Sequence, residues 1–221
     1  MLKKDENWIS LLWEWADTNK VSDLTWIEHD SYKRGGYFKG LPRDKEALLS
    51  LTKLNLLGSQ LTHLPAEIAN LTQLRGLYLL DNQLNSLPKE IGNLMHLEEL
   101  YLAGNCIKEL PKEIGNLKEL KVLLLQENQL TTLPKEIKGL QELTTLELGG
   151  NQLSSLPKEL GKLTALKKLT LWKNRLTHLP TEFKNLVNIS ELDVIYNKLE
   201  LTEENVLWLN QILENGCELS I

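Results

Sequence analysis

Cysteine and clustered basic residues are scarce in this sequence, and each shortage excludes a class of protein. Only Cys106 and Cys217 are present, 217 − 106 = 111 positions apart, so a disulfide framework is not expected. The formal net charge is −5. Binding to a phosphate backbone requires clustered Lys and Arg, so nucleic acid is not expected as a partner.

A long apolar run is missing from the N-terminal segment. The apolar residues of this segment are separated by acidic residues at Asp5, Glu6, Glu14 and Asp17. A secretory signal needs an apolar core and a membrane span needs a longer one, so neither is predicted. The chain is therefore expected to be cytoplasmic, or to be exported by a route that needs no classical signal peptide.

Reactive side chains do not converge in a way that indicates catalysis. His63 and His178 occupy the same position of a repeat described below, five units apart. At about 4.8 Å per strand this is roughly 24 Å, so they cannot share a metal. Cys106 has no His near it, and the glycine-rich stretch from Gly35 to Gly40 lacks the Gly-Lys-Ser/Thr ending of a phosphate loop. We predict no catalytic residue, metal ligand or cofactor, and the chain is not expected to be an enzyme.

What the sequence does contain is a repeat of 23 residues. The octapeptide LPKEIGNL occurs at Leu87–Leu94 and again at Leu110–Leu117, an offset of 110 − 87 = 23. Each unit reads LxxLxLxxNxLxxLPxEIxxLxx, and the seven units start at Leu51, Leu74, Leu97, Leu120, Leu143, Leu166 and Ile189. A period of this length indicates a stacked array of structural units.

Every unit predicts a short strand followed by a helical return. The LxL core has period 2, as a strand requires, and LPxEIxxL spaces apolar residues by three or four, which suits a short helix or 3-10 turn. One such turn cannot bury its apolar face alone, so neighbouring units must stack on it. The Asn after each strand, such as Asn128, is expected to hydrogen-bond backbone groups of adjacent turns.

The unit resembles the leucine-rich repeat, in the 23-residue form seen in many bacterial proteins and in intracellular Ras-binding scaffolds. The match covers Leu51 to about Leu199. The resemblance implies an α/β fold: a right-handed solenoid with a concave parallel β-sheet, short helices or 3-10 turns on the convex side, and helical caps at both ends. It also implies binding of other macromolecules on the concave face.

The two ends are expected to cover the exposed leucine layers of an open solenoid. Residues 1–50 are predicted to be an N-terminal cap with a degenerate repeat, 51–201 to hold the seven repeats, and 202–221 to form a C-terminal capping helix and strand. An apolar stripe in residues 1–20 predicts the first capping helix. Thr202 is the expected N-cap of the last helix. Asp23–Trp26 and Glu218–Ile221 are predicted to add outer strands to one nine-stranded sheet.

Side chains at positions 3, 5, 7 and 8 of each unit are expected to point out from the concave sheet. Several are apolar there although the fold does not require it, and such a face usually marks an interaction site. The predicted partner-binding residues are Leu57, Tyr78, Leu80, Tyr101, Val122, Leu124, Glu147, Lys168, Trp172, Lys173, Ile195 and Tyr196. The alternative is that Tyr78 and Tyr101 simply stack and stabilise the sheet.

The concave face is also predicted to contain a hollow. Gly149 and Gly150 are expected to leave a trough between the patch around Tyr101 and the patch around Trp172. The chain is interpreted as a non-enzymatic module that binds a protein partner, with a monomer favoured. A secreted or translocated bacterial effector that binds a host protein, and a glycan or lipopolysaccharide receptor, are alternatives that would use the same face.

Overall fold

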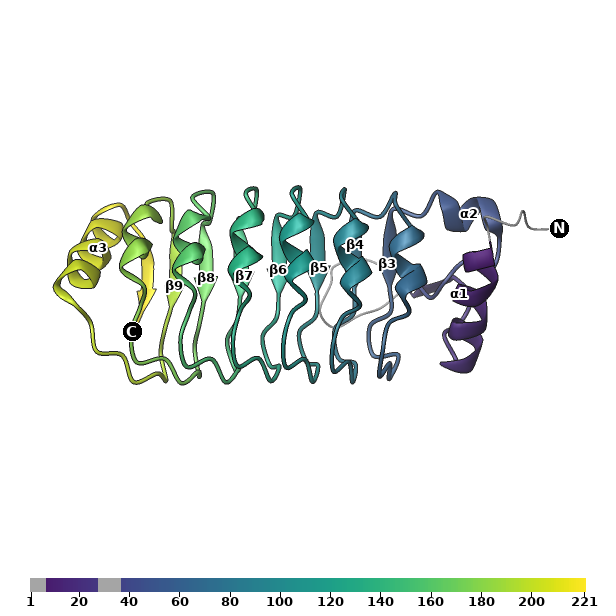
Figure 1. Cartoon of the computed structure of the whole chain (residues 1–221), viewed down its shortest axis with the longest axis horizontal. Helices are drawn as coiled ribbons and strands as arrows, with labels where there is room; N and C mark the ends of the chain where they lie inside the picture. Colours follow the sequence, from purple (N-terminus) through teal and green to yellow (C-terminus); the bar gives the residue numbers. More distant parts are fainter. Residues whose placement is uncertain (1–6, 28–36) are drawn as a thin grey trace.

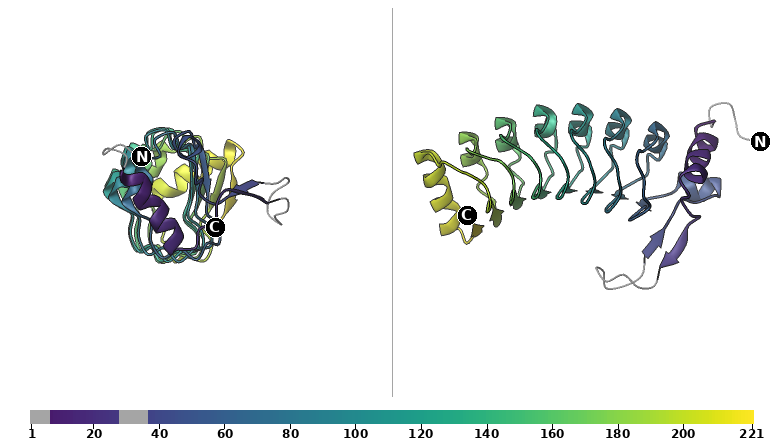
Figure 2. Two further views of the ribbon diagram at one scale, coloured as in Figure 1. Left: turned by 90° about the vertical axis from the view of Figure 1, so that its right-hand side faces the viewer. Right: turned by 90° about the horizontal axis from the view of Figure 1, so that it is seen from below.

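The computed structural model describes residues 7–27 and 37–221, without the side chains of Trp26 and Tyr37, and shows an open, curved solenoid (Figures 1 and 2). Its eight-stranded parallel sheet has the order β10-β9-β8-β7-β6-β5-β4-β3. The repeat strands are β3 (Lys53–Asn55), β4 (Gly76–Tyr78), β5 (Glu99–Tyr101), β6 (Val122–Leu124), β7 (Thr145–Glu147), β8 (Lys168–Thr170) and β9 (Glu191–Asp193). The predicted fold class is confirmed.

The strands pair in a register that repeats the period of the sequence. Leu100 of β5 lies opposite Leu77 of β4 on one side and Leu123 of β6 on the other, each 23 residues away. The central leucine of every repeat strand is fully buried, as are the leucines two positions later from Leu56 to Leu171. Stacked identical side chains therefore form one continuous apolar core, which is what the period-2 pattern predicts.

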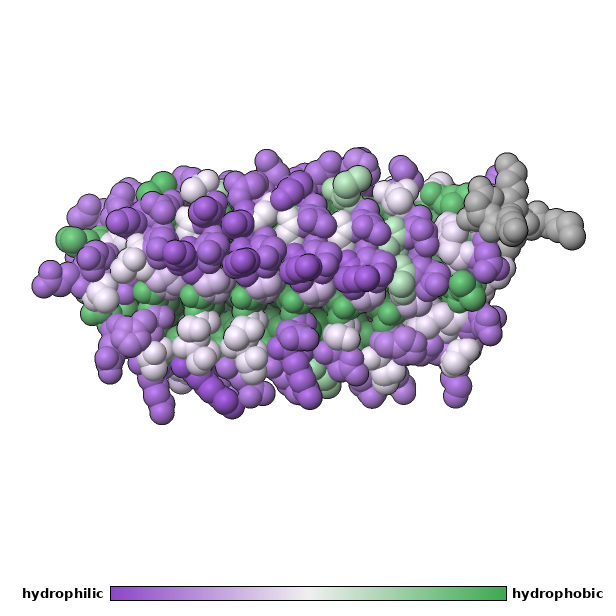
Figure 3. All heavy atoms as spheres, in the orientation of Figure 1, coloured by the Kyte–Doolittle hydropathy of each residue, from purple (hydrophilic) through white to green (hydrophobic). Residues whose placement is uncertain are grey.

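Short 3-10 helices cover the convex side. They are η2 (Ala66–Asn70), η3 (Lys89–Asn93), η4 (Lys112–Asn116), η5 (Lys135–Gly139), η6 (Lys158–Lys162) and η7 (Thr181–Asn185). Each begins directly after the repeated proline, which is the N-cap residue and is extended, with φ −64° and ψ 143° at Pro88. Figure 3 shows that this side is largely hydrophilic, with a line of apolar residues along the array.

The repeated asparagines form a buried hydrogen-bonded ladder. The side chain of Asn128 accepts from the backbone N–H of Ile107 in the preceding unit (3.0 Å). Its amide donates to the carbonyls of Leu102 (2.9 Å) and Leu125 (3.1 Å), in the preceding unit and its own. The other members make matching bonds, and those from Asn82 to Asn174 are buried. The predicted backbone bonding role of these residues is confirmed.

The N-terminal segment forms the predicted helix but not the predicted strand. Helix α1 (Asn7–Thr18) buries Ile9, Leu12, Trp15 and Ala16 and contacts η2. Strand β1 (Thr25–Ile27) pairs antiparallel with β2 (Tyr37–Lys39) in a separate two-stranded sheet. The assignment of Asp23–Trp26 to the main sheet was therefore wrong, and that sheet has eight strands, not nine. Residues 28–36, which include His29, Gly35 and Gly36, lie outside the described residues.

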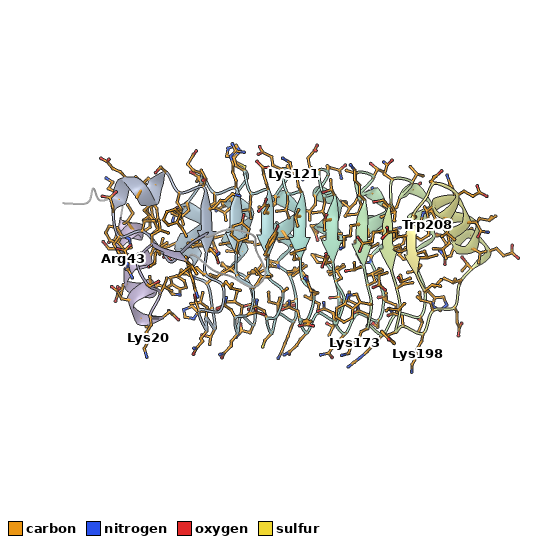
Figure 4. All side chains as sticks on the ribbon, turned by 180° about the vertical axis from the view of Figure 1, so that it is seen from behind. Lys20, Arg43, Lys121, Lys173, Lys198 and Trp208 are labelled. Carbon is orange, nitrogen blue, oxygen red and sulfur yellow. The ribbon has the colours of Figure 1, made fainter. Side chains whose placement is uncertain are left out.

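Arg43 ties the N-terminal elements to one another (labelled in Figure 4). Its guanidinium donates to the carbonyls of Trp13 and Val21, each at 3.1 Å, and pairs with Asp17 at 2.8 Å. A short helix that the sequence analysis missed, α2 (Lys45–Leu49), follows at once. The N-terminal elements therefore form one packed group beside β3.

The C-terminal segment closes the opposite end as predicted. Helix α3 (Glu203–Glu214) starts at Thr202, which forms a capping box with Asn205. Trp208, labelled in Figure 4, packs edge-to-face on Phe183 of η7 and donates to the carbonyl of Leu186 (3.3 Å). Strand β10 (Glu218–Ser220) then pairs parallel with β9, so this outer strand is confirmed.

Candidate functional site

The candidate site is the concave face of the sheet, which is turned toward the viewer in Figure 4. Five of its predicted apolar residues are half-buried there rather than fully packed away: Leu57, Leu80, Val122, Leu124 and Ile195. The hairpin of β1 and β2 projects from this same side of the coil at its N-terminal end (Figure 2). This projecting hairpin was not predicted from the sequence.

Two tyrosines form the centre of the N-terminal half of the face. The rings of Tyr78 and Tyr101 meet edge-to-face, with centroids 4.9 Å apart at 71°. The Tyr78 hydroxyl donates to the Glu99 carboxylate. Tyr78 is only 6% exposed whereas Tyr101 is half-buried, so Tyr101 is the more accessible of the two rings. Tyr78 is therefore better placed to stack on Tyr101 within the sheet than to contact a partner.

The electrostatic surroundings of both phenols are negative. Burial and the interaction with Glu99 raise the pKa of Tyr78 well above its usual range. Burial, together with the charges of Glu99 and Glu147, also raises the pKa of Tyr101. Both tyrosines are therefore neutral at physiological pH, and nearby carboxylates oppose their ionisation.

A pocket of about 390 Å3 opens over these tyrosines, and we call it the concave pocket. Its lining includes Leu80, Asp81, Tyr101, Ala103, Gly104 and Glu127, from three successive units. Ala103 and Gly104 are small, whereas the equivalent pairs Leu80–Asp81 and Gln126–Glu127 on either side are large. The pocket therefore deepens at the unit that starts at Leu97.

The predicted trough at Gly149 and Gly150 is occupied. A Cβ added to Gly149 would overlap the indole of Trp172, and one added to Gly150 would lie 3.2 Å from the Cη2 atom of the same ring. The large side chain of the next unit thus covers the two glycines. The prediction of a trough there was wrong, and the hollow lies two units nearer the N-terminus, where no tryptophan follows the small pair.

The charged residues predicted for the C-terminal half are only partly brought together. Lys168 lies between two carboxylates, 3.1 Å from Glu147 and 3.0 Å from Glu191. Hydrogen bonds from its ammonium, chiefly to Glu191, raise its pKa. Lys173 is exposed and lies along the edge of the face in Figure 4. Tyr196 is 78% exposed.

Position 8 of every unit has a backbone conformation that the sequence analysis missed. Its φ is positive at Gly58, Asp81, Gly104, Glu127, Gly150, Lys173 and Tyr196. Residues other than glycine rarely adopt a positive φ. The turn after each strand is therefore imposed by the stacked array and not by the type of residue at position 8. The glycines at position 8 of alternating units, Gly58, Gly104 and Gly150, could have indicated this conformation from the sequence.

Two kinds of site are not found in the part of the chain that the structure describes. Groups of three or more His, Cys, Asp or Glu side chains that could hold a metal ion are absent there. The same residues contain no helix that is both long and apolar enough to cross a membrane.

Comparison with known proteins identifies the family. The family model of the leucine-rich repeat region matches residues 51–130 and 112–214. The chain belongs to the leucine-rich repeat family. No curated protein matches this leucine-rich repeat chain significantly.

Similar solved structures are bacterial and plant leucine-rich repeat proteins. One from Leptospira interrogans is 38% identical with a TM-score of 0.73, over 80% of this chain and 45% of that one. The ectodomain of the Arabidopsis thaliana receptor kinase GASSHO1/SCHENGEN3, in complex with Casparian strip integrity factor 2, is 31% identical with a TM-score of 0.66, over 72% and 20%. The plant peptide hormone receptor RGFR1, in complex with RGF2, is 36% identical with a TM-score of 0.62, over 69% and 26%. This leucine-rich repeat chain thus spans less than half of each.

Proposed function

We propose that this leucine-rich repeat protein is a non-enzymatic interaction module that binds a protein partner on its concave face. The concave pocket is the observation that carries the proposal. Half-buried apolar side chains and the accessible ring of Tyr101 surround a hollow of about 390 Å3, which is large enough to receive a side chain of a partner. Two of the similar structures are receptor complexes, which supports ligand binding by this fold.

The curvature of the solenoid also favours this face. Strands β3 to β9 lie side by side along the concave side of the coil, so a partner there can contact many units at once (Figure 2). The convex side is largely hydrophilic (Figure 3). Apolar and aromatic groups on one face and charged groups on the other favour docking to the first.

Affinity capture with the purified chain as bait, followed by mutagenesis, tests the proposal. Tyr101→Ala and Trp172→Ala should each weaken binding of the captured partner about tenfold or more, because aromatic side chains at the centre of an interface carry much of the binding energy. The melting temperature should change by only a few degrees, since neither ring belongs to the leucine core.

Lys112→Ala is the matched control, because Lys112 is exposed on η4, on the convex side of the unit that carries Tyr101. It should leave the dissociation constant unchanged. Normal binding by both aromatic variants would exclude the concave face as the docking surface, and so would an equal loss in the Lys112 variant.

A further inference from the structure

We infer that the concave pocket receives an arginine side chain from an exposed segment of the partner. This inference rests on the proposed function and adds the chemistry that the pocket recognises. The charges that line the pocket are the first reason. Asp81 and Glu127 are both acidic, and the described residues that line the pocket include no Lys, Arg or His. A positively charged group is the natural complement of such a lining.

The two acidic residues of the concave pocket flank its glycine along the array. Asp81 and Glu127 both stand at position 8, in the units before and after that of Gly104. Because Gly104 has no side chain, the carboxylate of Asp81 leans over it, with Oδ1 only 2.5 Å from where a Cβ of Gly104 would lie. The two backbones are two strand spacings apart, about 10 Å, and both residues line the concave pocket.

Tyr101 supplies an aromatic surface beside the same hollow. A cation is attracted to the face of a phenol ring, and a planar guanidinium can also stack on it. A cation lies near the neighbouring ring in the protein itself, since the ammonium of Lys53, outside the pocket lining, is 6.0 Å from the centroid of the Tyr78 ring. The carboxylates of Glu99 and Glu147, which help to raise the pKa of Tyr101, add to the negative field there.

Other occupants fit this pocket less well. An acidic side chain would be repelled by Asp81 and Glu127. A purely apolar side chain would take water from both carboxylates and return no hydrogen bond, which is costly for a charged group. The aliphatic stem of arginine can contact Leu80 while its guanidinium donates to the carboxylates.

The test uses two pentapeptides that differ only in charge. These are acetyl-Gly-Ser-Arg-Ser-Gly-amide and the same peptide with citrulline, the neutral isostere of arginine. Each is titrated into the full chain labelled with 15N, and amide chemical shifts are followed. The arginine peptide should shift the amides of Tyr101, Ala103 and Gly104, and should bind about tenfold more tightly than the citrulline peptide.

Variants then assign the preference to the pocket. Asp81→Asn combined with Glu127→Gln should reduce the affinity for the arginine peptide to that for citrulline. These replacements keep side-chain shape, and Asn tolerates the positive φ at position 81. Glu136→Gln combined with Glu159→Gln on the convex helices removes the same charge and should have no effect.

The outcomes separate this inference from the proposed function. Equal affinity for the two peptides, shifts that lie outside the concave pocket, or full binding by the Asp81 and Glu127 double variant would overturn the arginine inference. If the captured partner nevertheless loses binding with Tyr101→Ala, the concave docking surface stands without it. If the arginine peptide binds selectively but the partner ignores Tyr101→Ala, the proposed function fails instead.

Discussion

Asn128 shows how one residue serves two units at once. It accepts from Ile107 and donates to Leu102 in the preceding unit, and also donates to Leu125 in its own. Leucine has the same number and branching of side-chain heavy atoms, but its side chain has no hydrogen-bonding group. Asn128→Leu should therefore leave buried backbone groups unpaired and lower the free energy of unfolding by about 1–3 kcal/mol.

Urea denaturation followed by far-UV circular dichroism measures this difference. Gln129→Leu is a suitable control, because Gln129 is the next residue and is only partly buried. An Asn128 variant with the same midpoint as the parent chain would show that the ladder contributes nothing to stability.

The ladder was predictable from sequence because its cause is local and repeated. The Asn stands where each unit turns inward from its strand, and buried amides need partners. The position of the indole of Trp172 was not predictable in this way. It depends on where a side chain of one unit leans relative to Gly149 of the preceding unit, and the repeat pattern gives the direction of a side chain but not its rotamer. The hollow was accordingly predicted at the wrong unit, and Asp81 and Glu127, which line it, were not among the predicted binding residues.

The hairpin depends on Gly40, where the chain leaves β2 and joins the repeats. Its φ is +109°, and a Cβ there would lie 2.5 Å from the carbonyl oxygens of Ser22 and Asp23. The neighbouring Leu41 N–H donates to Ser22, which secures the base of the hairpin. Gly40→Ala should therefore separate the hairpin from the repeats and cost about 1–3 kcal/mol from backbone strain alone.

Hydrogen exchange of the Leu41 amide should become faster in Gly40→Ala, while exchange in β5 to β8 stays slow. Gly58→Ala is the matched control, because Gly58 also has a positive φ but a Cβ there would meet no atom within 4 Å. Equal protection of Leu41 in the two variants would contradict the role assigned to Gly40.

At the scale of elements, the sequence predicted the repeated elements and the capping elements α1, α3 and β10, and it missed α2 and the hairpin of β1 and β2. Strands β3 to β9 and the 3-10 helices recur seven and six times respectively, so one pattern supports all of them. The stretch from Val21 to His29 matches the strand pattern once, but its neighbour β2 is closer along the chain than β3. A short hairpin closes at less entropic cost than a long connection, and β1 pairs with β2.

The whole molecule should tolerate loss of one complete unit better than loss of half a unit. Deletion of residues 120–142 joins Glu119 to Leu143 and leaves every remaining unit with its 23 residues. Asn151 would then replace Asn128 beside Ile107. We expect a folded chain with one cooperative transition and a urea m value reduced by about the share of one unit.

Deletion of residues 120–130 removes fewer residues but leaves a stub that cannot complete a turn. This variant should be the less stable of the two, because strand register and the asparagine ladder are both interrupted. Comparison of the two melting temperatures decides the point, and a higher value for the shorter deletion would contradict the picture of independent stacked units.

The matched register of the parallel strands also determines how the molecule would respond to mechanical force. Each unit advances the array by only one strand spacing, about 4.8 Å, while its 23 residues can extend to about 75–83 Å. Inner units are held by neighbours on both sides, whereas a terminal unit is held on one. When the two ends are pulled apart, the units would unfold one at a time from the ends inward. Each unfolding step would lengthen the chain by about 70–80 Å.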